Sequence, residues 1–281
     1  MAILFGCLTA ILFAGSSLMS SRIVHRINQN SAIAWIMFLG TLWSIPFLIH
    51  SGIPQGLSFK DIAILAWAGI GNVLGLIISF QALRVGKVGL VAPIVSTEGA
   101  LAAVMSSLFG ESLKPAVIFT LIIIVIGVVL AGLAKDPEPL EHEEPVKAVL
   151  LATLSAFFFG STLFATGYSS DSVSTIWLSF PPRAAGVVMI FLPLLLSRKL
   201  KMNRKALPFI VGVSFTEVIG FFSFALGSSY SIAIASVTAS QFAVLSAIGG
   251  YLLFKEKLGK LQILGVTIVI IGVLALTLAS R

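Results

Sequence analysis

Apolar and polar positions alternate along this chain in long blocks, with ten apolar stretches separated by short polar segments. Each stretch has about twenty residues, the length that a helix needs to cross the hydrocarbon core of a bilayer, about 30 Å thick. A backbone in lipid must satisfy its own hydrogen bonds, so we expect every stretch to be an α-helix. The predicted spans are residues 2–20, 32–50, 61–83, 88–109, 115–134, 148–168, 174–196, 206–227, 231–254 and 260–279.

The stretch Leu108–Leu133 occurs in two copies, because a similar pattern returns 145 residues later. At that offset Glu111 aligns with Glu256, and Gly127 aligns with Gly272. Each copy consists of an apolar helix end, a turn that carries a glutamate and a lysine, and a long apolar run. Such self-similarity indicates two related halves, and each half contains five of the predicted spans.

Five is an odd number, so the second half must enter the membrane from the side opposite to the first. We therefore predict an all-α membrane protein of ten transmembrane helices in two inverted five-helix repeats, with any substrate site at their interface. The first repeat spans residues 1–134 and the second spans residues 148–281. Residues 135–147 are acidic and rich in proline, which is typical of a solvated linker. Such a linker explains its His142 without a metal site.

Composition agrees with a membrane protein, since 58% of the residues are hydrophobic and only 10% are charged. The net charge of +7 lies mostly between the spans, so membrane orientation explains it better than nucleic-acid binding does. The gaps after the odd-numbered spans, together with Lys260 at the edge of the last gap, hold 14 of the 18 Lys and Arg residues. The positive-inside rule therefore predicts that these gaps are cytoplasmic and that both termini lie outside. The single cysteine, Cys7, excludes an internal disulfide and a cysteine-based metal cluster.

Three charged side chains lie well inside predicted spans, namely Glu98, Arg183 and Glu217. A charge at the bilayer centre costs at least about 2.5–3.5 kcal/mol, so such a residue faces either a cavity or a partner. Two interpretations follow: the three residues line a substrate path, or Arg183 pairs with one of the acids and locks helices together. Pro181 and Pro182 interrupt the helical hydrogen bonds just before Arg183, which favours the substrate path.

Polar and small residues also follow one face of two spans, at the spacing that places side chains on the same side of a helix. In the third span they are Asn72, Gly75 and Ser79, and in the eighth they are Glu217, Gly220, Phe221 and Phe224. Asn72 and Glu217 favour a cavity wall, whereas the glycines favour close packing of helices.

The starts of the fourth and ninth spans are unusually polar for helices that face lipid, which favours positions inside the protein. Aromatic residues of the first, sixth and seventh spans offer apolar surface for a ligand, although most phenylalanines in such a chain face lipid or pack. The remaining candidate substrate-binding residues are Phe13, Ser17, Pro93, Ser96, Phe159, Trp177, Thr238 and Gln241.

The sequence has no Walker motif and no HExxH motif. Two acids inside spans are too few to suggest an intramembrane enzyme. We therefore expect a protein that is not an enzyme and that has no catalytic residue, no cofactor and no metal. Its expected partners are a small-molecule substrate and the lipid bilayer, with no nucleic acid, and the expected state is a monomer or a weak homodimer.

The paired pattern resembles the ten-helix branch of the drug/metabolite transporter superfamily, the EamA-type carriers. The resemblance is carried by Phe80-Gln-Ala-Leu-Arg-Val-Gly, Val91-Ala-Pro93, Phe224-Ala-Leu-Gly, Ser236-Val-Thr and the twin turns at Glu111 and Glu256. It covers essentially the whole chain. Within this branch the sequence looks most similar to the YddG-type exporters of aromatic and other amino acids. The usual proline of the fourth span is present as Pro93, but the matching position of the ninth span is Thr238.

The resemblance implies a carrier in the inner membrane of a bacterium, with a central cavity walled by spans 1, 3, 4, 6, 8 and 9 and with spans 5 and 10 outside it. Alternating access would come from rocking of one five-helix half, or of helix pairs such as spans 3–4 and 8–9, against the rest. The expected function is export of aromatic or neutral amino acids or of similar small metabolites.

Two alternatives to amino-acid export remain open at this stage. An exporter of lipophilic cations or drugs would use a buried glutamate as the counter-charge. A non-transporting scaffold or sensor would pair its acids with Arg183 at a closed interface. The sequence also leaves two forms of coupling open, because Glu98 or Glu217 would carry a proton in an antiporter, whereas facilitated diffusion needs neither.

Overall fold

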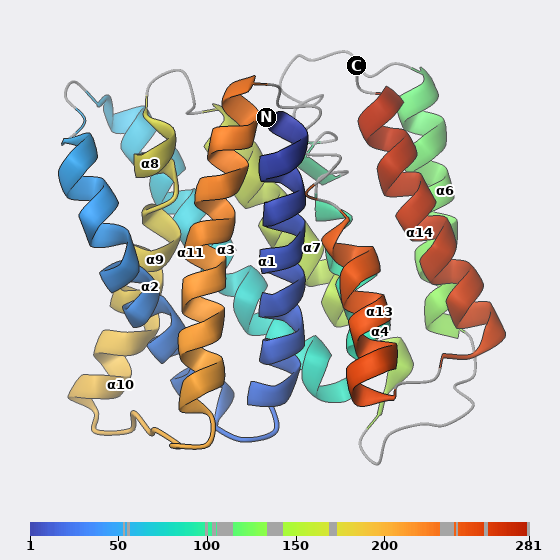
Figure 1. The fold of residues 1–281 in the computed structure, drawn as a ribbon, viewed down its shortest axis with the longest axis horizontal. Helices are drawn as coiled ribbons and strands as arrows, with labels where there is room; N and C mark the ends of the chain where they lie inside the picture. Colours follow the sequence, from blue (N-terminus) through green and yellow to red (C-terminus); the bar gives the residue numbers. More distant parts are fainter. Residues whose placement is uncertain are drawn as a thin grey trace.

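The computed structural model describes residues 1–52, 54, 57–98, 101–102, 105, 115–133, 143–168, 173–230, 239, 241–255 and 258–279. Every regular element in this part of the chain is a helix (Figure 1). In chain order the elements are α1 (Ala2–Ile23), α2 (Gln29–Ser51), α3 (Phe59–Val85), α4 (Val88–Val95), α6 (Pro115–Leu133), α7 (Pro145–Tyr168), α8 (Thr175–Leu178), α9 (Pro181–Gly186), η1 (Val187–Phe191), α10 (Leu192–Leu196), α11 (Leu207–Tyr230), α13 (Phe242–Phe254) and α14 (Lys260–Ala279). Each of the ten predicted spans contains at least one of them, so the predicted all-α class is confirmed.

Several sequence predictions fall on residues outside this description. They concern the twin turns at Glu111 and Glu256, the linker up to His142, and Thr238 at the start of the ninth span. In the described part of the chain, six helices are long and apolar enough to cross a membrane, judged by length and composition. Many large apolar side chains of these helices are exposed. An exposed apolar surface of this extent marks contact with lipid.

The predicted interruption of the seventh span is present at the two prolines. Helix α8 ends at Leu178, and α9 begins at Pro181. Proline is tolerated at the first position of a helix, because a backbone N–H there would have no carbonyl acceptor within the helix. Directly after α9 comes η1, a π-helical segment of five residues. Such segments are uncommon and occur frequently at functional sites. The seventh span is therefore built from short pieces rather than from one continuous helix.

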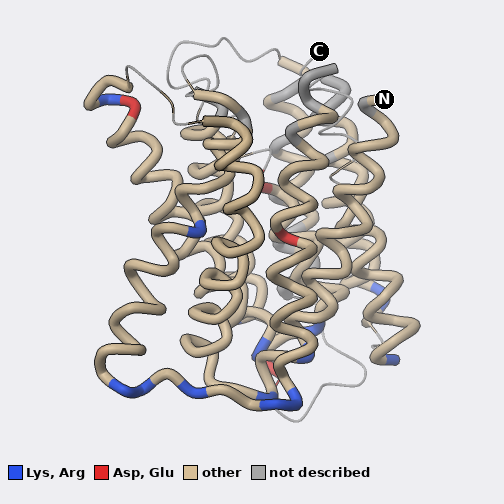
Figure 2. Tube along the Cα trace, turned by 60° about the vertical axis from the view of Figure 1, so that its left-hand side comes forward, with Lys and Arg blue, Asp and Glu red and all other residues tan. Residues whose placement is uncertain are grey.

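The two faces of the molecule differ in charge. Helix α1 begins and α14 ends at the same face (Figure 1). Figure 2 shows that most described Lys and Arg residues gather at the opposite face. We call this the basic face, and it is formed by the connections that follow α1, α3, α10 and α13. An even number of spans accounts for both chain ends lying on one side.

Helices pack mainly across the two halves, and the pairs come in symmetric sets. Helix α1 packs against α11 and α13, and its counterpart α7 packs against α3 and α4. Likewise α2 packs against α11, while α9 packs against α3. Replacing each helix by its equivalent in the other half turns one of these packing pairs into the other. Two repeats related by a two-fold axis require this correspondence. Helices α6 and α14, which are equivalent to each other, pack together at one side (Figure 1).

We group the core helices into two mixed bundles, because the most extensive contacts, α1 with α11 and α3 with α7, each join the two halves of the chain. Bundle I is defined as α1, α2, α11 and α13, and bundle II as α3, α4, α7 and α9. The bundles meet where α4 packs against α13 and where α2 packs against α9 and η1. Each bundle takes helices from both halves, so a relative motion of intact bundles differs from the rocking of one five-helix half against the other.

The symmetry extends to individual side chains within the bundles. Thr9 Oγ1 donates a hydrogen bond to the Gly220 carbonyl at 3.3 Å, and Ser155 Oγ donates to the Gly75 carbonyl at 2.8 Å. The phenylalanine four residues after each donor, Phe13 or Phe159, packs against the glycine whose carbonyl accepts that donor's hydrogen bond. A Cβ placed on Gly220 would stand 2.5 Å from Phe13 Cε1, and one on Gly75 would stand 2.7 Å from Phe159 Cδ1. Glycine is therefore required at both positions for the helices to approach.

We predict that Gly75→Ala and Gly220→Ala each destabilise the protein by about 1–2 kcal/mol, because overpacking forces the phenylalanine ring to move. The matched control is Gly15→Ala, since a Cβ there has nothing within 4 Å. That substitution should be neutral or should stabilise the protein by up to about 1 kcal/mol through helix propensity. Thermal unfolding in detergent measures all three, and equal shifts for the three variants would contradict the packing described.

Candidate functional site

Arg183 is buried where the two bundles meet. It belongs to α9, two residues after Pro181, and 4% of its side chain is exposed. Its Cγ lies 3.4 Å from the point that a Cβ on Gly40 of α2 would occupy, so the missing side chain of Gly40 leaves room for Arg183. Nη1 donates a long hydrogen bond of 3.4 Å to the Ser179 carbonyl in the interrupted part of the seventh span. The break therefore supplies a free carbonyl to a buried cation.

Glu217 on α11 provides the opposite charge. Its Oε2 lies 3.9 Å from Arg183 Nη2, at the outer limit of an ion pair, and its Oε1 accepts a hydrogen bond of 2.6 Å from Ser16 Oγ on α1. Although Arg183 is almost completely buried, 28% of the Glu217 side chain is exposed. The carboxylate is thus held by two helices but remains accessible from one side.

An aromatic surface lies beside this ion pair. Arg183 Cζ stands 4.5 Å from the ring centroid of Phe221, a cation–π contact. Phe221 in turn packs edge-on against Phe13, with 5.4 Å between centroids, and Phe13 packs edge-on against Phe242 at 6.2 Å. The site therefore joins a cation, an anion and a run of aromatic rings. Three of these residues, Phe13, Phe221 and Phe242, come from three different helices of bundle I.

The equivalent position in the first half is uncharged. With the offset that aligns Gly75 with Gly220, Asn72 of α3 takes the place of Glu217. Asn72 is buried. Next to it, a Cβ on Gly71 would stand 2.8 Å from Thr162 Oγ1, and Thr162 Oγ1 donates to the Ala68 carbonyl at 3.1 Å. The first half therefore has close helix packing at the position where the second half has an ion pair. The site is asymmetric, although the packing of the helices around it is symmetric.

Glu98 lies on bundle II, just beyond the end of α4 at Val95. It is partly buried, and its carboxyl is within electrostatic range of Glu217. The backbone around it is close to α7, because a Cβ on Gly160 would stand 2.7 Å from the Glu98 carbonyl oxygen. The backbone of Glu98 is therefore packed within bundle II, against α7.

The other predicted site residues are distributed more widely. Ser96 Oγ donates to the Pro93 carbonyl at 2.7 Å, so both are engaged within the same turn. Trp177 donates its indole N–H to the Gly52 carbonyl beyond the end of α2 and packs edge-on against Phe180. The structure places Ser17, Ser79, Phe224 and Gln241 in partly buried positions, and Thr238 lies outside the described residues.

Sequence reasoning missed two features of this region. Ser16, rather than Ser17, is the residue whose hydroxyl contacts Glu217, and it shares a helical face with Thr9 and Phe13. A second ion pair joins Lys87 Nζ to Glu143 Oε2 at 3.6 Å, with 1% and 0% of the side chains exposed. Both of its residues fall between predicted spans, where charges are usually solvated, so their burial could not be predicted from the sequence.

We predict that Glu217→Leu destabilises the protein by about 3–5 kcal/mol, because it leaves the arginine buried without its carboxylate. Arg183→Leu should destabilise the protein less, because Glu217 keeps its hydrogen bond to Ser16 and its side chain is partly exposed to solvent. The double variant should lose less stability than the sum of the two single variants. Thermal unfolding tests this, with the exposed Glu144→Gln as a control that should change stability by less than about 0.5 kcal/mol. Purely additive effects would contradict a direct pair.

Comparisons with known proteins identify the family. A search of curated proteins gives no match. Among solved structures, a crystal structure whose title names no function aligns with 99% of this chain and 96% of its own, with 15% sequence identity and a TM-score of 0.66, which shows a shared fold. The model of the EamA-like transporter family matches residues 1–133 and again residues 146–278. The chain therefore belongs to the EamA-like transporter family and is a multi-pass membrane transporter of small molecules, not an enzyme.

Proposed function

We propose that this transporter exports aromatic or neutral amino acids, or similar small zwitterionic metabolites, as the resemblance to YddG-type exporters suggests. The observation that carries the proposal is the pairing of Arg183 with a partly exposed Glu217 beside aromatic rings. An amino acid presents a carboxylate and an ammonium group close together, and this site holds one group of each opposite charge.

Each part of the substrate has a chemical counterpart in the site. Arg183 offers planar N–H donors that suit a carboxylate in a bidentate pair. Glu217 accepts hydrogen bonds and would take the ammonium group, with Glu98 as a second acid nearby. The rings of Phe13 and Phe221 offer the apolar contact that an aromatic or aliphatic side chain needs. At 3.9 Å the ion pair is long, so a bound zwitterion would replace a weak contact with two stronger ones.

The location of the pair suggests how binding drives transport. Glu217 and its partner Ser16 belong to bundle I, while Arg183 and Glu98 belong to bundle II. A substrate held by Arg183 and Glu217 would therefore connect the two bundles, and its arrival would alter the contact that joins them. This favours alternating access by relative motion of the mixed bundles over rocking of one five-helix half.

The second candidate is export of a lipophilic cation. Glu98 is a second acid within the membrane besides Glu217, so one of the two can serve as the counter-charge of a cationic ligand. Proton antiport uses the same acids, since Glu98 or Glu217 would exchange a proton for the substrate. A sealed structural pair is less consistent with the geometry, because 28% of the Glu217 side chain remains exposed.

Flux into proteoliposomes tests the proposal. Labelled amino acids and a lipophilic cation are offered in parallel, with and without a pH gradient, to wild type, Glu217→Gln and Glu144→Gln. We expect amino-acid flux that falls by roughly 10–100-fold in Glu217→Gln, because a hydrogen bond to a charged group contributes about 1.5–3 kcal/mol. Glu144→Gln removes an exposed acid at the basic face and should retain wild-type flux.

The remaining outcomes of that experiment separate the alternatives. Cation flux without amino-acid flux would contradict the proposed substrate class and support the second candidate. Amino-acid flux that survives Glu217→Gln would contradict the proposed role of the pair. A pH gradient that accelerates wild-type flux but leaves the residual flux of Glu217→Gln unchanged would identify proton antiport through this residue.

We also propose that the basic face is cytoplasmic, in the inner membrane of a bacterium, because positive loops are retained inside. A cysteine at Lys199, in a Cys7→Ser background, should then be shielded from an impermeant thiol reagent added to intact cells. Labelling of this cysteine from outside would contradict the orientation.

A further inference from the structure

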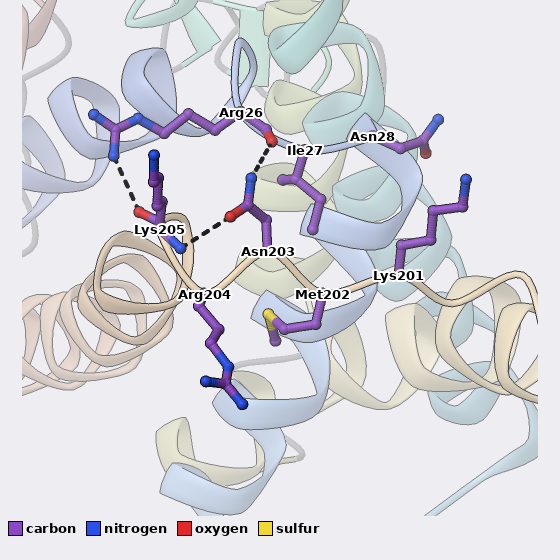
Figure 3. Close-up of a pocket in the computed structure, with 8 residues that line it drawn as sticks. All are labelled: Arg26, Ile27, Asn28, Lys201, Met202, Asn203, Arg204 and Lys205. Atoms are coloured by element: carbon purple, nitrogen blue, oxygen red, sulfur yellow. Dashed lines mark hydrogen bonds between the residues drawn. The ribbon is translucent and has the colours of Figure 1, made fainter.

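A cavity of about 560 Å³ lies at the basic face, and neither Arg183 nor Glu217 lines it. It is formed by the turn between α1 and α2 and by the loop between α10 and α11. Polar and basic side chains dominate its lining, and they are Arg26, Asn28, Lys201, Asn203, Arg204 and Lys205 (Figure 3). Two segments almost two hundred residues apart therefore build one basic site.

Hydrogen bonds hold the two segments in place. Arg26 Nη1 donates to the Lys205 carbonyl at 3.0 Å, and Asn203 Nδ2 donates to the Arg26 carbonyl at 2.8 Å (Figure 3). The indole N–H of Trp35 donates to the Lys201 carbonyl at 3.1 Å, and the Lys201 N–H donates to Ser31 Oγ at 3.2 Å. The cavity is thus formed by fixed backbone rather than by a loose loop.

Four cations line this cavity. In the described part of the chain, no acidic side chain forms an ion pair with Arg26, Lys201, Arg204 or Lys205. Arg26 is oriented by a cation–π contact, with its Cζ 4.7 Å from the ring centroid of Phe209. Four positive charges around one concave site, with no ion pair to a described acid, produce a potential that attracts an anion.

Exposed apolar side chains lie directly beside the basic loop in sequence. Leu195 and Leu196 end α10 just before the loop, with 49% and 81% of their surface exposed, and Leu207 begins α11 just after it. The loop turns sharply between them, because Arg198 adopts φ +56° and Lys199 N–H bonds back to the Leu194 carbonyl. Exposed leucines therefore flank, within a few residues in sequence, the loop that supplies Lys201, Arg204 and Lys205 to the basic cavity.

We infer that this cavity binds the phosphate headgroup of an anionic phospholipid, whose acyl chains lie along the exposed leucines of α10 and α11. A phosphate carries the negative charge that no described acidic side chain supplies to Lys201, Arg204 and Lys205, and basic clusters beside membrane spans recognise such headgroups. A free soluble anion would use the same cations but would make no use of the leucines. The inference does not depend on which substrate the transporter carries.

The test uses full-length protein purified in a neutral detergent and titrated with phosphatidylglycerol, with thermal unfolding as the measurement of binding. Phosphatidylcholine and inorganic phosphate are titrated in parallel, to represent a neutral headgroup and a soluble anion. The site variant is Lys201→Gln with Arg204→Gln. The matched control is Arg198→Asn with Lys199→Gln, which removes the same charge from the same loop but changes no residue that lines the cavity.

We expect phosphatidylglycerol to raise the unfolding temperature of the wild type at concentrations where phosphatidylcholine does not. The site variant should bind phosphatidylglycerol about thirtyfold more weakly, and the control should bind like the wild type. Equal weakening in both variants would show a general charge effect and overturn the site. If phosphatidylcholine or inorganic phosphate raised the unfolding temperature of the wild type as much as phosphatidylglycerol does, the proposed lipid site would be contradicted. This comparison uses the wild type alone, so it holds even if the site variant fails to fold.

Discussion

Burial of the Arg183 guanidinium is the constraint on which the architecture of the central region depends. A cation in the membrane interior is costly unless a partner and hydrogen bonds compensate for the water it has lost. Each neighbour supplies part of that compensation: the Glu217 carboxylate, the Phe221 ring, the Ser179 carbonyl freed by the helix break, and the space left by Gly40. The interrupted seventh span and the small residue on α2 therefore have a common cause.

The same constraint explains why two similar halves produce an asymmetric site. The repeats share their packing, since the Thr9–Gly220 and Ser155–Gly75 hydrogen bonds are equivalent. The repeats differ at the candidate site, because the residue of the first half that is equivalent to Glu217 is the uncharged Asn72. In the proposed mechanism the two bundles move as units, and a substrate bound at the Arg183–Glu217 pair changes their relative position.

The sequence predicted the features that depend on periodicity and composition. Ten apolar runs, an odd number per half and the proline pair were sufficient for the helices, the inverted repeat and the break before Arg183. The side-chain contacts within the site were harder to predict from the sequence. Periodicity shows which residues share one face of a helix, but it does not show which of them contacts a second helix that lies two hundred residues away in the chain. This is why Ser17 was predicted where Ser16 makes the contact, and why the buried Lys87–Glu143 pair looked like loop charge.

The central claim is that a substrate bound at the ion pair moves bundle I relative to bundle II. Spin labels at Ile3 on α1 and Phe59 on α3, both exposed and on different bundles, report that distance in a Cys7→Ser background. Pulsed electron paramagnetic resonance should show a shift of the distance distribution when a transported amino acid is added, and no shift in Glu217→Gln. A distribution that stays the same with a transported substrate would contradict the account.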